Sequence, residues 1–309
     1  MPNSKPPVAL IAGPTASGKS ALGLALAEAE NGIVINADSA QIYRDVPILS
    51  AMPGEKDMQR AEHRLYGIRD GSQPCSAAEW AQLAKEEFAR AHRLGRMPVL
   101  VGGTGLYLRT LLDGIAPVPP IGADVRFEVR SRAVAENRAE LERLDPAGAE
   151  RLNPADSART ARALEVVLST GRTLADWQSL REGGIGGDIA LLPLVLLPPR
   201  DWLYDRCDAR FRHMIEQGAA TEVERLLRRG LDPSLPIMRA IGVREIAAFL
   251  RREIDEGAML AAGQQSTRRY AKRQYTWFAH QPPAGWPRFT QALEPSTTAA
   301  ALALLRQKP

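Results

Sequence analysis

The feature that most constrains the fold is a glycine-rich segment near the start of the 309-residue chain. Residues 13–20 read GPTASGKS and match the phosphate-loop (P-loop) pattern G-x-x-x-x-G-K-[ST] at every fixed position. An apolar run, residues 8–12, precedes the loop, and a helix-forming stretch, residues 21–30, follows it. The segment therefore predicts a strand, a tight loop and a helix whose first backbone N–H groups bind an anion. The motif alone does not distinguish a nucleotide triphosphate from another diphosphate.

Two side chains of this loop have predicted roles. Lys19 is expected to hold a terminal phosphate, as the lysine of this pattern does. The hydroxyl of Ser20 is expected to ligate a magnesium ion, which prefers oxygen ligands. Mg²⁺ is therefore the expected cofactor.

The composition is that of an ordinary soluble globular protein. Apolar residues make up 45% of the chain and charged residues 25%. No apolar run approaches the ~20 residues that span a bilayer, and the segment before the first strand leaves no room for a signal peptide. Cys75 and Cys207 lie far apart and predict free thiols in a reducing compartment. We therefore expect a cytoplasmic protein that does not contact a membrane.

Positive charge is concentrated toward the C-terminal end. The net charge is +4 and the isoelectric point is about 9.2. Residues 257–281 contain no acidic residue, whereas Arg268, Arg269, Lys272 and Arg273 stand among aromatic side chains. Helical spacing places Arg269 and Arg273 one turn apart. The segment is either a solvated basic face or a nucleic-acid contact, and beside a phosphate loop we weigh the two equally.

Alternating strands and helices predict an α/β fold with a parallel sheet. Short apolar strands are expected at residues 33–37, 97–101 and 189–197. Apolar strands joined by helices form a parallel sheet that is covered on both faces. The fold class is therefore a P-loop parallel-sheet core flanked by helices.

Polar groups follow three of these strand ends. The phosphate loop follows the first strand, Asp38 and Ser39 follow the second, and Thr104 follows a later one. The carboxyl ends of parallel strands meet at one edge, where ligands bind, so we expect these groups to face one crevice. An aspartate after a strand is usually only a turn former. The convergence nevertheless favours a functional role for Asp38.

A helical insertion is predicted within the core. Three prolines at 117–120 form a stiff connector before it, and a glycine-rich run at 182–187 follows it. We therefore predict a catalytic core formed by residues 1–114 and 187–309, with an insertion domain at 115–186. Such an insertion, hinged at both ends, suits a lid that closes over a substrate.

Helix caps and periodicity locate several helices. Ser76 and Glu79 form a capping box that opens a helix through Leu94. In the insertion, Asp156 or Ser157 is expected to cap a helix that carries Leu164, Val167 and Leu168 on one face. Three further helices are predicted in the last third: residues 201–217, 238–252 and 259–278. The tail after residue 282 carries little signal.

Five motifs occur in order over most of the chain. They are GPTASGKS at 13–20, DSAQIYR at 38–44, GGTGLY at 102–107, RALEV at 162–166 and RRYAKRQYTWF at 268–278. Only the first is generic. The set resembles the tRNA dimethylallyltransferases, the isopentenyl transferases that act on tRNA, and the length resembles the bacterial members.

This resemblance implies an activity and its partners. The chain would transfer a dimethylallyl group from dimethylallyl diphosphate to N6 of the adenine immediately 3′ of the anticodon, releasing diphosphate. The partners would be dimethylallyl diphosphate and the anticodon stem-loop of tRNA, and we expect a monomer. Because the target base is stacked in the anticodon, base flipping is expected.

The resemblance also implies roles for individual residues. Asp38 would take the proton of the weakly nucleophilic amine, Thr104 would lie at the adenine, and Arg210 would meet the charge of the leaving group. The diphosphate would be bound by Gly13, Thr15, Ala16, Ser17, Gly18, Lys19 and Ser20, with the metal on Ser20. The tRNA would be bound by Asp38, Ser39, Ala40, Gln41, Thr104, Arg126, Arg159, Arg162, Arg239, Arg244, Arg269 and Arg273.

Two alternative functions are weighed against this one. An ATP-dependent small-molecule or nucleotide kinase would use the same loop, but the strand into Gly102 ends without the aspartate of a Walker B element. A nucleotide-dependent RNA-binding switch would explain the basic helix but gives Asp38 and Thr104 no role. Val243 departs from the family pattern, where tyrosine is common, and leaves one RNA or packing contact undefined.

Overall fold

The computed structural model describes residues 5–306. The chain divides into two compact units. One comprises the chain up to Leu111 and from Gly186 onward, and we call it the core unit. The other, Leu112–Ile185, is the insertion unit. The predicted insertion, 115–186, has nearly the same boundaries.

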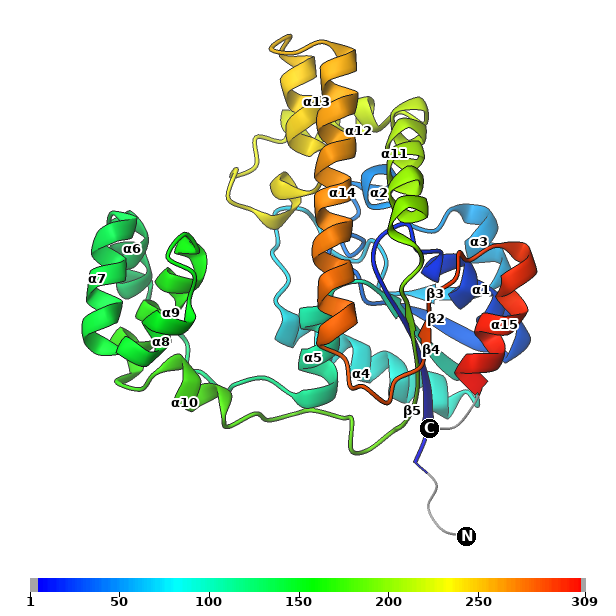
Figure 1. Cartoon of the computed structure of the whole chain (residues 1–309), viewed down its shortest axis with the longest axis horizontal. Helices are drawn as coiled ribbons and strands as arrows, with labels where there is room; N and C mark the ends of the chain where they lie inside the picture. Colours follow the sequence, from blue (N-terminus) through cyan, green and yellow to red (C-terminus); the bar gives the residue numbers. More distant parts are fainter. Residues whose placement is uncertain (1–4, 307–309) are drawn as a thin grey trace. The chain divides into compact units, whose positions relative to one another are not determined.

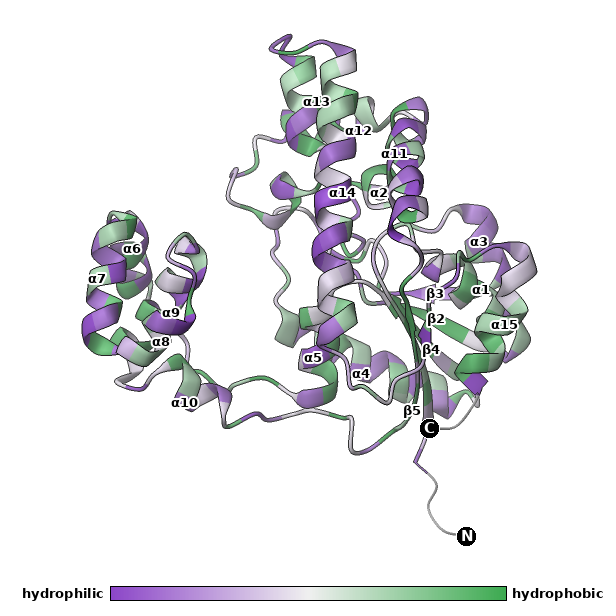
Figure 2. Ribbon diagram, viewed as in Figure 1, coloured by the Kyte–Doolittle hydropathy of each residue, from purple (hydrophilic) through white to green (hydrophobic). Residues whose placement is uncertain are grey.

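Within the described residues, the core unit contains a six-stranded parallel sheet, which confirms the predicted fold class (Figure 1). The strand order is β3-β2-β4-β1-β5-β6. The strands are β1 (Pro7–Ala12), β2 (Gly32–Asn36), β3 (Glu62–Arg64), β4 (Met97–Gly102), β5 (Ala190–Leu196) and β6 (Arg288–Phe289). Figure 2 shows that apolar residues concentrate along the central strands. After the exposed Pro7, the rest of strand β1 is buried because helices cover both faces of the sheet.

One face of the sheet is covered by α1 (Lys19–Ala29) and α15 (Pro295–Arg306). Leu22 of α1 and Leu305 of α15 join Val99 of β4 in one buried cluster. The C-terminal tail, which was predicted to belong to the core but carried little signal for any particular element, therefore contributes α15 to the core.

The other face is covered by α4 (Ala77–Arg93), with α5 (Gly105–Asp113) beside it. Trp80 of α4 is fully buried, and its indole N–H donates a 2.9 Å hydrogen bond to the carbonyl oxygen of Asn36. Its ring stacks on Tyr107 of α5 with 4.5 Å between the ring centroids. These contacts fix the helices against the end of β2, where the predicted site begins.

Two predicted helix starts are confirmed. At the start of α4, the N–H of Glu79 donates to the hydroxyl of Ser76, and the N–H of Ser76 donates to the carboxylate of Glu79. At the start of a helix in the insertion unit, the N–H of Arg159 donates to the carboxylate of Asp156. Both caps satisfy backbone donors that a helix leaves unpaired at its first turn.

The remaining helices of the core unit are α2 (Pro47–Ser50), α3 (Glu55–Arg60), α11 (Arg200–Glu216), α12 (Ala219–Arg228), a 3₁₀ helix (Pro236–Arg239), α13 (Val243–Leu250) and α14 (Glu256–His280). The helix predicted at 238–252 is broken, because Gly242 has a φ of 94°. Helices α11 and α14 pack side by side (Figure 1). At Gly263, an added Cβ would lie 2.0 Å from Cζ of Phe211, so glycine permits this close packing.

The insertion unit is helical throughout its ordered elements. They are α6 (Ala123–Ser131), α7 (Val134–Leu144), α8 (Pro146–Arg151), α9 (Ser157–Thr170) and α10 (Leu174–Gln178). Val129, Leu141 and Leu164 form the centre of its own hydrophobic core. Of the face predicted to be apolar in α9, Leu164 is buried and Val167 packs against this core, whereas Leu168 is 38% exposed. Among residues 5–306, no helix combines the length and the apolar character that crossing a membrane requires.

Candidate active site

The phosphate loop joins β1 to α1 as predicted, and its two fixed glycines are sterically required. An added Cβ at Gly13 would lie 2.7 Å from the carbonyl oxygen of Leu196. Gly18 directly precedes α1 with a φ of 93°, which other residues rarely adopt. No acidic residue lies in the first turn of α1. The positive end of the helix therefore stays available to an anion.

Two cations, buried Lys19 and partly buried Arg210, lie at this loop. Lys19 is 8% exposed, and its ammonium group donates to the carbonyl oxygen of Pro14 at 3.1 Å. Burial lowers the pKa of Lys19 to about 8, although Asp38 raises it, and Arg210 lowers it further. The pKa of Arg210 is also lowered, mainly by burial, and Asp38 partly opposes this. Lys19 and Arg210 beside the one carboxylate of Asp38 leave an excess of positive charge at the loop, which favours a polyanionic ligand.

Helices α11 and α14 hold the loop from outside. Arg206 donates to the carbonyl oxygen of Ala16 at 3.0 Å, and Arg210 donates to the hydroxyl of Thr15 at 3.2 Å. The backbone N–H of Thr15 donates to the side-chain oxygen of Gln274 at 2.7 Å. The backbone N–H of Thr15 is therefore already hydrogen-bonded within the protein. A bound anion must accept hydrogen bonds from other N–H groups of the loop.

The turn after β2 carries Asp38. Asn36 holds it at both sides: its side-chain oxygen accepts the N–H of Asp38 at 2.8 Å, and its side-chain N–H donates to the Asp38 carbonyl at 3.0 Å. One carboxylate oxygen of Asp38, Oδ1, accepts the N–H of Ala40 at 3.0 Å. The N–H of Ser39 donates to the hydroxyl of Thr104 at 2.9 Å. The predicted meeting of Asp38 and Thr104 at one sheet edge is therefore present.

Two cavities open at this edge and share Lys19, Ser20 and Arg210. The first, which we call the Asp38 pocket, has a volume of about 270 Å³. Asp38 and Tyr270 line it together with the shared residues. One carboxylate, that of Asp38, and four cationic side chains thus line one small cavity; the cations are Lys19, Arg210, Arg239 and Arg273.

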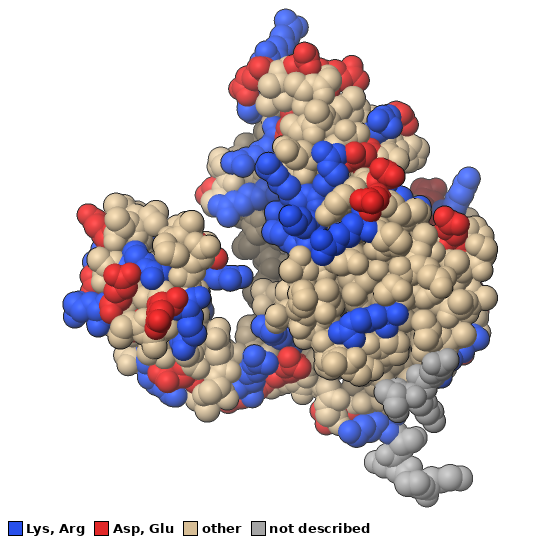
Figure 3. Space-filling model, in the orientation of Figure 1, with Lys and Arg blue, Asp and Glu red and all other residues tan. Residues whose placement is uncertain are grey.

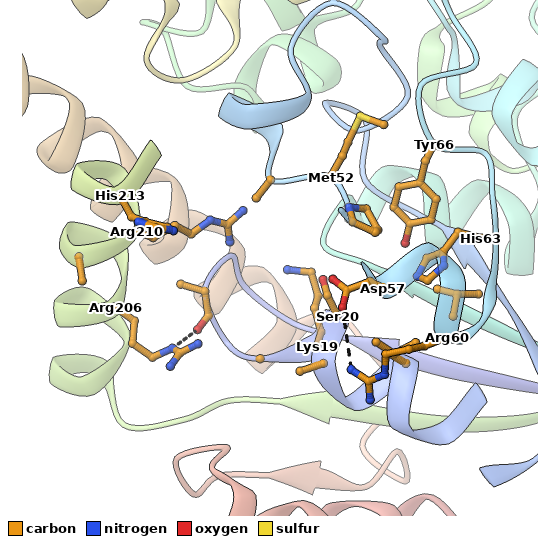
Figure 4. A pocket seen from close by; sticks show the side chains of 18 residues that line it. Lys19, Ser20, Met52, Asp57, Arg60, His63, Tyr66, Arg206, Arg210 and His213 are labelled. Carbon is orange, nitrogen blue, oxygen red and sulfur yellow. Dashed lines mark hydrogen bonds and ion pairs between the residues drawn. The ribbon is translucent and has the colours of Figure 1, made fainter. Parts of the chain in front are cut away.

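The second cavity, the Ser20 pocket, has a volume of about 670 Å³. Figure 4 shows Lys19 and Ser20 between two groups of side chains. Arg206, Arg210 and His213 come from α11, whereas Asp57, Arg60, His63 and Tyr66 come from α3, β3 and the segment after it. Burial is the main cause that lowers the pKa of His63 and raises that of Tyr66. Because Lys19 lines both cavities, an anion bound to Lys19 would be accessible from both of them.

The structure brings most of the predicted core residues to these two cavities. Those that line them are Thr15, Ala16, Gly18, Lys19, Ser20, Asp38, Ala40, Gln41, Arg210, Arg239 and Arg273. Those that do not are Gly13, Ser17, Ser39, Thr104, Arg244 and Arg269. The predicted tRNA-binding residues Arg126, Arg159 and Arg162 are exposed and belong to the insertion unit.

The prediction missed several residues at the site. Tyr270 lines the Asp38 pocket, and burial raises the pKa of its hydroxyl. Arg206 and Gln274 contact the phosphate loop. The i, i+4 spacing of Tyr270 and Gln274 on the basic helix was the available signal, because it places both on neighbouring turns.

The basic helix predicted at 259–278 is α14, and part of its charge is already neutralised. Arg268 contacts both carboxylate oxygens of Asp208 at 2.5 Å. Arg269, Lys272 and Arg273 are exposed. Figure 3 shows Lys and Arg side chains gathering over α14. The exposed basic surface is thus smaller than the sequence suggested, but it adjoins the Asp38 pocket through Arg273.

The residues present fit a magnesium ion that is bound partly by the protein and partly by a substrate phosphate. Within the part of the chain that the structure describes, no group of three or more His, Cys, Asp or Glu side chains could hold a metal by itself. The Ser20 hydroxyl and the Asp38 carboxylate both line the Asp38 pocket. Oxygen donors of this kind suit Mg²⁺, which commonly binds through one or two protein groups plus substrate phosphates.

Fold and site together define a P-loop α/β protein in which a buried, cation-rich anion loop adjoins a carboxylate pocket. The sequence model of the family described as IPP transferase matches residues 41–281. The chain therefore belongs to the IPP transferase family, which confirms the resemblance found in its motifs. Family membership favours a transferase over the kinase alternative.

Curated relatives and solved structures agree with this assignment. The chain is 64% identical over 289 residues to a tRNA dimethylallyltransferase of Erythrobacter litoralis, covering 92% of this chain and 91% of the relative. It is 55% identical over 282 residues to that of Zymomonas mobilis, covering 91% and 90%.

Two solved structures share the fold. A tRNA isopentenylpyrophosphate transferase from Bacillus halodurans is similar with a TM-score of 0.69 and 30% identity, covering 99% of this chain and 98% of that one. A eukaryotic dimethylallyltransferase acting on tRNA is similar with a TM-score of 0.77 and 27% identity, covering 88% and 69%.

Proposed function

We propose that this protein transfers a dimethylallyl group from dimethylallyl diphosphate to N6 of the adenine immediately 3′ of the anticodon in tRNA. The observation that carries this proposal is the Asp38 pocket, where a carboxylate faces Lys19 and Arg210 across one small cavity. The names of the curated relatives support the substrate pair. A monomeric state and a cytoplasmic location are further proposals that rest on the sequence.

The reaction needs a base for the amine proton and cations for the leaving diphosphate, and the Asp38 pocket is lined by both. The adenine amine is a weak nucleophile, so its proton must be removed as the new C–N bond forms. Asp38 is the proposed acceptor of that proton, since its second carboxylate oxygen, Oδ2, has no hydrogen-bond partner among residues 5–306. As the bond from the allylic carbon to oxygen breaks, its electron pair leaves with the diphosphate. Lys19 and Arg210 stabilise this growing charge.

Magnesium, when bound at Ser20, would supply further positive charge to the leaving diphosphate. The fold alone places the Ser20 hydroxyl at the phosphate loop, because Ser20 lies directly after Lys19 at the start of α1. The phosphate-loop residues Gly13 to Ser20 are proposed to bind the same diphosphate through the open end of the helix.

The acceptor base would enter the Asp38 pocket from the side of α14. An adenine stacked in an anticodon loop cannot reach a pocket of this size, so it must be flipped out. Thr104 is proposed to act at the base, because its hydroxyl already fixes the backbone after Asp38 through Ser39. Tyr270, next to the same pocket, offers an aromatic surface for the base.

The RNA backbone would be held by arginines of both units. In the core unit we propose Arg239, Arg244, Arg269 and Arg273, of which the first and last line the Asp38 pocket. Ser39, Ala40 and Gln41 are proposed to contact the anticodon near Asp38. In the insertion unit we propose Arg126, Arg159 and Arg162, and we propose that this unit acts as a lid on bound RNA.

Product analysis tests the proposal directly. The protein is incubated with labelled dimethylallyl diphosphate and unmodified tRNA, and the RNA is digested to nucleosides. The expected product is N6-dimethylallyl adenosine at the position 3′ of the anticodon. A tRNA with guanine at that position, which lacks the N6 amine, is the control and should gain no label. Phosphoryl transfer from ATP without prenylation would instead establish the kinase alternative.

A further inference from the structure

Gln274 joins two loops that are distant in the sequence. It lies on α14 and is only 6% exposed. Its side-chain oxygen accepts the N–H of Thr15 in the phosphate loop at 2.7 Å. Its side-chain N–H donates to the carbonyl oxygen of Gly103 at 2.8 Å. One amide therefore fixes the phosphate loop against the loop that carries Thr104.

The second of these loops is tied in turn to Asp38. The N–H of Thr104 donates to the carbonyl oxygen of Ala37 at 3.2 Å. The Thr104 hydroxyl accepts the N–H of Ser39 at 2.9 Å. The residues on both sides of Asp38 are thus bonded to Thr104. A displacement of the Thr104 loop would carry the carboxylate with it.

The Thr104 loop packs so closely against α14 that no space is left between them for an added side-chain atom at Gly103 or Gly105. A Cβ added at Gly103 would lie 2.4 Å from the side-chain nitrogen of Gln274. A Cβ added at Gly105 would lie 2.5 Å from the ring of Trp277, one turn further along the helix. Close packing against α14 therefore fixes the position of the Thr104 loop. Through Gln274, the same helix also holds the phosphate loop.

The same helix also lines the acceptor side of the site. Thr267, Tyr270 and Arg273 of α14 line the Asp38 pocket, and Gln274 follows Arg273 directly. The helix thus contributes to the pocket with one set of side chains and to the two loops with Gln274. The amide is suited to this place because it donates and accepts at once without carrying a charge.

We propose that Gln274 is a positioning residue for the transfer reaction. It sets the distance between the loop that holds the leaving diphosphate and the turn that holds Asp38. This inference rests on the proposed function and deepens it, since transfer requires the reacting atoms to lie about 3–3.5 Å apart. A misplacement of about 1 Å costs roughly 100-fold in rate.

The first test is Gln274→Met, which keeps the length of the side chain and removes both hydrogen bonds. We expect kcat to fall roughly 100-fold, while the Kd for tRNA stays within about twofold of the wild type. The matched control is Gln264→Met on the same helix. Gln264 donates to the carbonyl oxygen of Asp208 in α11 at 3.2 Å and, among residues 5–306, has no hydrogen bond to either loop. Its kcat should match the wild type.

The second test, Gln274→Glu, separates positioning from a merely structural role. An ionised glutamate can accept from Thr15 but cannot donate to Gly103, whereas a protonated one can do both. The kcat of this variant, divided by that of the wild type, should therefore rise as the pH falls. A loss of packing alone would give a ratio that does not change with pH.

Three results would overturn the inference, and a fourth would overturn the proposed function on which it rests. Equal kcat values for Gln274→Met and Gln264→Met would overturn the inference. A Gln274→Met variant that melts at a lower temperature but keeps full kcat at 25 °C would also overturn it. If Gln274→Met does not fold, a ratio of Gln274→Glu kcat to wild-type kcat that does not change with pH would overturn it. Absence of transfer by the wild type would instead overturn the proposed function, and this inference with it.

Discussion

The buried ammonium group of Lys19 should make diphosphate binding depend on pH above neutrality. Burial lowers its pKa from 10.5 to about 8 in the free protein. A diphosphate binds the charged form, and its negative charge raises the pKa again in the complex. The affinity should therefore fall as the pH rises through 8, because the free protein loses the proton that the complex retains.

The size of the effect follows from the titration curve. With a pKa near 8, Lys19 is charged in about 90% of molecules at pH 7 and about 9% at pH 9. The Kd for dimethylallyl diphosphate should thus rise roughly tenfold between these pH values. Cys207, which also influences Lys19, titrates outside this window because burial raises its pKa to about 11.

Isothermal titration with dimethylallyl diphosphate, in the absence of RNA, measures this dependence. Lys19→Met is the matched control: it should bind more weakly and lose the pH dependence between 7 and 9. A wild-type Kd that is constant up to pH 10 would refute the assignment of Lys19 as a buried, titrating phosphate ligand.

The same group predicts an opposite trend for stability without ligand. The folded-state pKa of Lys19, about 8, lies below its ordinary value of 10.5, so the charged form is penalised in the folded protein. The penalty is fully present below pH 8 and is relieved as the pH rises toward 10.5. Relative to Lys19→Met, the free energy of unfolding should therefore rise over this range, by on the order of 3 kcal/mol.

Two further changes test the packing and the RNA-binding surface. Gly263→Ala should lower the free energy of unfolding by about 1–3 kcal/mol, because its Cβ would lie 2.0 Å from Phe211. In urea titrations, the control Gly257→Ala, whose nearest contact is 3.4 Å away, should change little. Replacing Arg269 and Arg273 with Ala should weaken tRNA binding and reduce the slope of log K against log salt by roughly 1.4–1.8. Arg306→Ala, on α15, is the control, and an unchanged slope for the double variant would leave α14 as a solvated basic face.

Features set by short-range patterns were predictable from the sequence. The phosphate loop, the capping box of Ser76 and Glu79, and the cap at Asp156 each depend on residues a few positions apart. The meeting of Asp38 with Thr104 was also predictable, because it follows from the rule that parallel strands end at one edge.

Features set by long-range contacts were not predictable. Gln274 and Thr15 are separated by 259 positions, and no local pattern marks their hydrogen bond. The pairing of Arg268 with Asp208 likewise depends on how α11 and α14 pack. Strands β3 and β6, of three and two residues, are too short to show a period. The break at Gly242 was missed because glycine within a helical pattern is often tolerated.

The central claim is that the carboxylate of Asp38 takes the proton of the acceptor amine beside a diphosphate held by the phosphate loop. Its most direct test is the single-turnover rate of prenyl transfer by Asp38→Asn, with both substrates saturating and both Kd values measured. Asparagine keeps the oxygen that accepts the N–H of Ala40, so the turn should be preserved. The account predicts a rate lower by roughly 100-fold to 10,000-fold with little change in either Kd. A rate within twofold of the wild type would contradict it.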